Sequence, residues 1–116
     1  AAALPLEAGP MEISPQQLAD KLRRGEPVWL LDVRQGWEHE LARLPDHALI
    51  PLPELPSRLD EVRPGPGAQI VCYCHHGVRS LGAAAILREA GFDGALSLAG
   101  GIDLWSRLID SSVPQY

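Results

Sequence analysis

The sequence predicts a single α/β domain with a mostly parallel sheet. Residues 28–31 and 69–73 are short, continuous apolar runs, which are typical of strands buried on both faces of a sheet. Segments with helix-start signals or helical spacing of apolar residues lie before, between and after these runs. Strands that alternate with helices in this way favour a parallel sheet covered by helices.

The first helix is expected to begin after Ser14. Serine is a favourable N-cap, Pro15 suits the first helical position, and Gln17 is placed to complete a capping box. Apolar side chains then recur at helical spacing as far as Leu22, and Gly25 is a typical stop. The strand at 28–31 follows this helix.

Turn signals and apolar spacing predict the other elements. We expect a short helix at 35–43, a short strand at 47–52, a helical segment at 55–62 and a loop at 64–67. The strand at 69–73 precedes a helix at 80–91, a strand at 95–98 and a last helix at 102–108. Trp29 and Trp105 are expected in the core.

Length and charge limit the function classes. The chain has 116 residues, enough for one domain, and its formal net charge is -5. An acidic chain without a clustered basic patch argues against nucleic acid as a partner, and no apolar run is long enough to suggest a membrane span. Residues 1–10 lack the basic start of an intact signal peptide, so we expect a flexible N-terminal segment there and one domain over 11–116.

Both cysteines lie in the segment CYCHHGVRS, residues 72–80. A single C-x-C pair does not make a disulfide framework, so we expect a reducing, cytoplasmic compartment. Cys74 follows a strand, where loop N–H groups and a helix N-terminus favour a thiolate, and Arg79 adds a nearby cation. Gly77 permits backbone angles that a side chain would block. These features indicate an activated nucleophile at Cys74.

Other interpretations of this segment stay open. Cys72 lies within the strand and is expected to be a buried hydrophobe, which argues against a redox pair with Cys74. Four potential metal ligands occur together (Cys72, Cys74, His75 and His76), but adjacent residues cannot all face one tetrahedral ion. Further ligands would have to come from His39 or His47. A loop that binds an anion without chemistry is the third alternative.

Four polar residues near this segment have two interpretations each. Asp32 and Arg34 end a strand at the same sheet edge, where they either orient Arg79 and shape the site or form a structural ion pair. His75 and His76 either tune the thiolate or face solvent and contribute only backbone N–H groups. The structural pair and the solvent-facing histidines are the simpler interpretations.

Three motifs occur in order along the chain. Residues 30–34 read Leu-Leu-Asp-Val-Arg and are followed by Glu38. The segment Cys74-x-x-Gly77-x-Arg79 comes next, and residues 98–105 supply a closing Leu-x-Gly-Gly-x-x-x-Trp. Together these motifs resemble the rhodanese-like domain family, over about residues 12–110.

The resemblance implies a rhodanese-like fold, with a five-stranded, mostly parallel sheet flanked by helices on both faces. It also implies a single-domain sulfurtransferase that forms a persulfide on Cys74. A donor such as thiosulfate would give up its outer sulfur, and a thiol, cyanide or a protein acceptor would remove it. Arg79 would add positive charge or hold the sulfonate end of a donor. The family needs no metal or organic cofactor. The loop whose N–H groups would bind the persulfide comprises His75, His76, Gly77, Val78, Arg79 and Ser80.

Loop length separates sulfurtransferases from related phosphatases and arsenate reductases, in which one more residue lies between cysteine and arginine. Four residues intervene here, which favours sulfur transfer. A non-catalytic sulfur-relay or binding module stays the alternative. Residues 44–51 depart from the family's Gly-His-Ile-x-Gly-Ala. Residues 109–116 resemble the tail of rhodanese domains fused to ubiquitin-like activating enzymes, which pass sulfur to a carrier protein.

Overall fold

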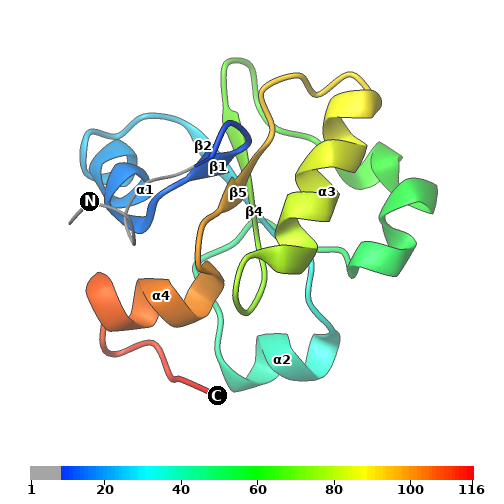
Figure 1. The fold of residues 1–116 in the computed structure, drawn as a ribbon. Coiled ribbons are helices and arrows are strands. Elements are labelled where there is room, and N and C mark those ends of the chain that lie inside the picture. The colour runs from blue at the N-terminus through cyan, green and yellow to red at the C-terminus, as the bar shows by residue number, and fades with distance from the viewer. Residues whose placement is uncertain (1–8) are drawn as a thin grey trace.

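The computed structural model describes residues 9–116, which form a sheet with helices on both faces (Figure 1). Residues 1–8 of the segment expected to be flexible lie outside the described residues. The strands lie side by side in the order β1-β5-β4-β2-β3, and every neighbouring pair is parallel. The sheet is therefore entirely parallel where we expected a mostly parallel one. The strands are β1 (Glu12–Ile13), β2 (Val28–Asp32), β3 (Ala48–Leu49), β4 (Gln69–Tyr73) and β5 (Leu96–Leu98).

The elements follow the expected order with two differences, one in a helical segment and one in a strand. The segment expected to be helical over 55–62 consists of two 3-10 helices, because Pro56 has no N–H to donate within an α-helix. The strand β1 was not expected, since two residues carry no readable periodicity. Ser14 caps the first helix as expected, with a complete capping box. The helices are α1 (Pro15–Arg23), α2 (Gly36–Leu41), η2 (Leu52–Ser57), η3 (Leu59–Glu61), α3 (Val78–Glu89) and α4 (Gly101–Leu108).

Alternation of side chains along β4 divides the core between the two faces of the sheet. Ile70 and Cys72 face the side covered by α3 and η2, whereas Val71 and Tyr73 face the side covered by α1 and α4 (Figure 1). The two tryptophans expected in the core are buried, one on each face. Among the described residues, no helix has both the length and the apolar character to cross a bilayer.

The carboxyl ends of the strands lead to one edge of the sheet. In Figure 1 the loop after β4 lies at this edge between α2 and the start of α4, and the C-terminal end of the chain comes close to α2. In parallel α/β sheets this edge is where ligands bind, because loops and helix N-termini converge there. The fold therefore brings the cysteine loop, the Asp-Val-Arg strand end and the Gly-Gly turn to one place.

Candidate active site

The loop between β4 and α3 folds around the sulfur of Cys74. The backbone N–H groups of Gly77 and Ser80 donate to Sγ at 3.1 and 3.3 Å, and Ser80 Oγ lies 3.3 Å from it. Both N–H groups belong to the start of α3, where backbone donors have no acceptor within the helix. Cys74 is only 1% exposed, so these dipoles act on its sulfur with little screening by water. The arrangement favours negative charge on the sulfur.

The Gly-Gly turn holds this loop from behind. The N–H groups of the two residues after Gly101 donate to the carbonyl oxygens of Cys74 and His75, at 2.9 and 3.1 Å. A Cβ atom on Gly101 would overlap both carbonyl groups, and its φ of +63° also disfavours a side chain. Gly77 has a φ of +97°, so the permissive glycine expected in the loop is required there. The start of α4 thus binds the loop carbonyls and leaves the loop N–H groups facing the sulfur.

Arg79, at the start of α3, binds the Glu38 carboxylate of α2. Its guanidinium donates to both carboxylate oxygens of Glu38, at 2.6 and 2.9 Å, and makes no hydrogen bond to Cys74. These hydrogen bonds lower the pKa of Glu38 to about 2, so the pair is ionised at neutral pH. The cation that we expected beside the sulfur is therefore also paired with Glu38, and its support of an anionic Cys74, which would act through space, stays a prediction.

Asp32 and Arg34 form a buried ion pair at the end of β2. Arg34 Nε and Nη2 donate to the two carboxylate oxygens of Asp32 at 2.8 and 2.7 Å, and both residues are inaccessible to solvent. Arg34 also donates to the carbonyls of Glu38 and Ala42 and to the hydroxyl of Tyr116. Burial opposes its charge, but these partners raise its pKa overall. This geometry matches the structural-pair interpretation. Arg34 is linked to the cysteine loop indirectly, through Glu38, which binds Arg79, and through Tyr116, whose ring stacks on His75.

Tyr116 is a member of the site that sequence reasoning missed. Its hydroxyl donates to Glu38 Oε2 at 2.8 Å, and its ring stacks on the His75 ring with centroids 3.9 Å apart. The edge of Trp37 approaches the same tyrosine ring. The resemblance of the tail to other rhodanese domains points only to a partner, and no local pattern predicts a contact between residues 78 positions apart.

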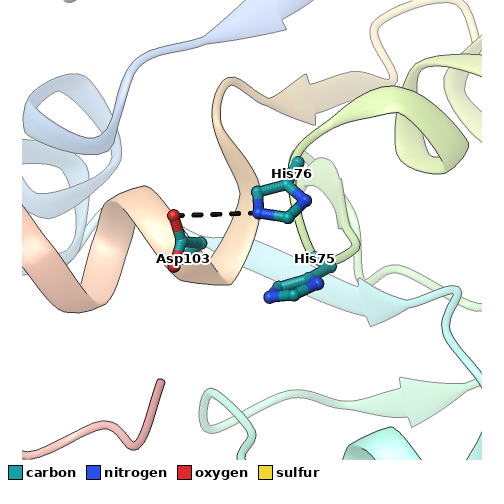
Figure 2. A group of neighbouring side chains, drawn as sticks. All are labelled: His75, His76 and Asp103. Carbon is teal, nitrogen blue, oxygen red and sulfur yellow. Dashed lines mark ion pairs between the residues drawn. The ribbon is translucent and has the colours of Figure 1, made fainter. Parts of the chain in front are cut away.

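His75 and His76 lie beside Asp103 of α4, at the outer side of the loop (Figure 2). His76 is exposed and its Nε2 lies 3.9 Å from an Asp103 oxygen. His75 is less accessible, because its ring stacks between His76 and the tail. The solvent-facing interpretation therefore fits His76 better than His75. Arg107 and the histidines lower the pKa of Asp103, so this group is ionised at neutral pH.

The residues considered as metal ligands do not converge as a set. Cys72 lies in the core on the α3 face, where burial raises its pKa to about 12, so it is a neutral thiol at neutral pH. His39 Nδ1 lies 3.0 Å from Asp32, and His47 Nδ1 accepts the N–H of Leu30, so both are engaged away from the loop. The two loop histidines do lie together with Asp103: one ligand atom from each of the three residues lies within 4.8 Å of the others.

Fold and site together define an α/β protein that holds one cysteine sulfur among backbone N–H donors at the carboxyl edge of a parallel sheet. Comparison with known proteins identifies this class further. The chain belongs to the rhodanese-like domain family, whose sequence model matches residues 14–108. The family resemblance of the three motifs is thereby confirmed over most of the domain.

Three relatives illustrate the similarity. A sulfurtransferase of Allochromatium vinosum is 34% identical, with 83% of this chain and 88% of that protein covered. The adenylyltransferase and sulfurtransferase MOCS3 of Arabidopsis thaliana is 31% identical over 97% of this chain, which spans only 29% of that longer protein. The structure of the human single-domain sulfurtransferase TSTD1 superimposes with a TM-score of 0.72 at 27% identity, covering 86% of this chain and 98% of that one.

Proposed function

We propose that this domain is a sulfurtransferase in which Cys74 carries a sulfane sulfur as a persulfide. The observation that supports this most is the donation of two backbone N–H groups to Sγ at the start of α3. Such fixed donors stabilise a charged sulfur without any rearrangement at the moment of reaction. Membership of the rhodanese-like family and the names of the relatives point to the same chemistry.

The first step is attack by the Cys74 thiolate on the outer sulfur of the donor. With thiosulfate, an S–S bond forms between Cys74 and that sulfur, the bond between the two donor sulfurs breaks, and sulfite leaves with the electron pair. Cys74 then holds a persulfide whose terminal sulfur carries the negative charge. The loop N–H groups that donate to Sγ would help to stabilise the negatively charged persulfide.

The second step returns the thiolate. A nucleophile such as cyanide attacks the terminal sulfur, a carbon–sulfur bond forms, the S–S bond breaks, and thiocyanate leaves. Because Cys74 is only 1% exposed, the sulfur donor and the acceptor can reach it only with the reacting atom, from the open side of the loop. Four residues between cysteine and arginine give a loop that suits one sulfur atom better than a phosphoryl group.

Mass spectrometry after brief incubation with thiosulfate tests this proposal. Wild type is expected to gain one sulfur atom, which cyanide then removes as thiocyanate. Cys74→Ser is expected to gain none. Cys72→Ala is the matched control: its thiol is fully buried, so this variant is expected to load and unload like wild type.

Other outcomes separate the alternatives. Stable loading without turnover to cyanide or small thiols would favour a sulfur relay that needs a protein acceptor, as the name of the Bacillus subtilis relative, a putative sulfur carrier protein, suggests for that protein. Failure of wild type to load would overturn sulfur transfer from thiosulfate. Hydrolysis of an aryl phosphate that depends on Cys74 would favour a phosphatase instead.

A further inference from the structure

A second serine lies behind the cysteine loop. Ser97 is on β5, beside Cys72 in the register of the sheet, and it is inaccessible to solvent. Its Oγ lies 2.7 Å from Ser80 Oγ, which is itself 3.3 Å from the sulfur of Cys74. Ser97 Oγ also reaches the carbonyl of Gly77, at 3.5 Å. Sulfur, two hydroxyls and a loop carbonyl therefore form one buried chain.

The direction of hydrogen bonds along this chain depends on the charge of the sulfur. While Cys74 is a thiol, its S–H can donate to Ser80, the Ser80 O–H to Ser97, and the Ser97 O–H to the Gly77 carbonyl. When the sulfur is ionised it has no hydrogen to donate. Ser80 then donates to sulfur, and Ser97 turns from the long contact with the carbonyl to donate to Ser80. Apart from the proton that the sulfur loses, only the two hydroxyl hydrogens change position.

We propose that Ser97 is a positioning residue that acts through Ser80 to stabilise the anionic sulfur of Cys74. Ser97 supplies the donor that Ser80 needs once the Ser80 hydrogen is committed to sulfur. Linked donors of this kind polarise one another in a buried site, so the bond from Ser80 to sulfur is stronger with Ser97 in place. A role for Ser97 in catalysis rests on the proposed sulfur transfer, but stabilisation of the anionic sulfur by the hydroxyl chain does not.

Removing the Ser97 hydroxyl leaves every charged and titratable group around the loop in place. Glu38 and Arg79 neutralise each other on one side, and the other groups come from β4, the loop, α4 and the tail. Among the described residues, the charged and titratable groups on the loop and on the elements in contact with it include Cys72, His75, His76, Glu38, Arg79, Asp103 and Tyr116. A change in the reactivity of Cys74 in Ser97→Ala therefore reports the hydroxyl chain.

The test is the rate of Cys74 alkylation by iodoacetamide as a function of pH, with the modified residue identified by mass. Ser80→Ala is expected to slow alkylation at pH 7 by about tenfold, as for a lost hydrogen bond to a charged group. Ser97→Ala is expected to slow it by about threefold and to displace the profile to higher pH. Ser97→Thr, which keeps a hydroxyl, is expected to restore the wild-type profile.

Two further variants keep this test sharp. Ser106→Ala removes another buried hydroxyl, one that donates to the carbonyl of Val113 far from the sulfur, and is expected to leave the profile unchanged. In the Ser80→Ala background, Ser97→Ala is expected to have no additional effect, because its route to sulfur is gone.

The proposal is overturned if folded Ser97→Ala reacts like wild type, or if the two alanine substitutions add. Thermal melts establish that each variant is folded. Since alkylation requires no sulfur donor, failure of thiosulfate to load wild type would count against the proposed function and leave this result intact.

Discussion

The carboxyl ends of β2 and β4 are neighbours in the sheet but are built from opposite kinds of group. At the end of β4, two backbone N–H groups donate to the Cys74 sulfur and the Ser80 hydroxyl lies within hydrogen-bonding distance of it, and all three groups are formally neutral. At the end of β2, Asp32 and Arg34 pair with each other, and Arg34 also donates to surrounding carbonyls. Asp32 and Tyr73 are register partners, so these two regions lie side by side.

This difference separates the charges of the site from its proposed chemistry. The charged groups form ion pairs with one another: Arg34 pairs with Asp32, and Arg79 pairs with Glu38. They fix the positions of β2, α2 and the tail around the loop. The Cys74 sulfur, the group proposed to react, is instead stabilised by oriented backbone N–H dipoles, which require no movement of a charged side chain. Substitutions in the charged region should therefore damage stability more than chemistry, and substitutions behind the loop should damage both.

The largest effect on stability is expected from Arg34→Met. The substitution leaves the Asp32 carboxylate buried without its partner, which costs about 3–5 kcal/mol. Urea denaturation measures the loss, and sulfur loading per folded molecule should change much less. Arg58 is the matched control, because it also binds two carboxylates but lies in solvent. Arg58→Met should cost far less, because its ion pairs are accessible to water, and equal losses in the two variants would contradict the comparison.

A somewhat smaller loss of stability, with a clear loss of chemistry, is expected from Gly101→Ala. The left-handed backbone at this residue costs an alanine about 1–2 kcal/mol. Overlap with the carbonyls of Cys74 and His75 should add about 1–3 kcal/mol and displace the loop. Thiosulfate loading should fall by at least about tenfold, because the N–H donors move from the sulfur.

Gly25 provides the control for backbone strain alone. It has a similar φ of +72°, and no other group lies within 4 Å of a Cβ placed there. Gly25→Ala should carry only the cost of the left-handed backbone and leave loading unchanged. If both glycine variants load equally well, close contact behind the loop does not control the chemistry.

The smallest effect is expected from Glu38→Gln, and it should appear in acid. The folded state lowers the pKa of Glu38 to about 2 from an ordinary 4.5, so the stability that this ionised group contributes is fully present above pH 4.5 and declines as the pH falls toward 2. Glu38→Gln should therefore be less stable at pH 7 and should lose less stability between pH 4.5 and 2. Urea midpoints at several pH values measure this. In Glu61→Gln, which removes an exposed partner of Arg58, the pH dependence should change less; an unchanged slope in Glu38→Gln would contradict the assignment.

Local features were predictable because neighbours in the sequence create them. The apolar run 69–73 forms β4 with the expected bounds, and Ser14 caps α1 with the expected partner, Gln17. The segment expected to be helical at 55–62 is helical, but the spacing of apolar residues did not show that Pro56 would leave it as two 3-10 helices. The motif around Cys74 was recognisable because a strand, a glycine and a helix start follow one another directly.

The partners of these residues were not predictable in the same way. Arg79 was expected to add positive charge beside the sulfur, but its hydrogen-bond partner Glu38, 41 positions away, could not be read from local sequence. Ser97 had no local signal, because it reaches Ser80 only through the pairing of β5 with β4.

Two kinds of information therefore define this domain. Apolar periodicity, turn residues and three short motifs specify an α/β chain with a cysteine at the end of a strand, because those properties depend on residues a few positions apart. The neutral donors around the sulfur, the paired charges beside it and the tyrosine from the tail were decided by tertiary structure. Each depends on segments that only the assembled sheet brings within hydrogen-bonding distance.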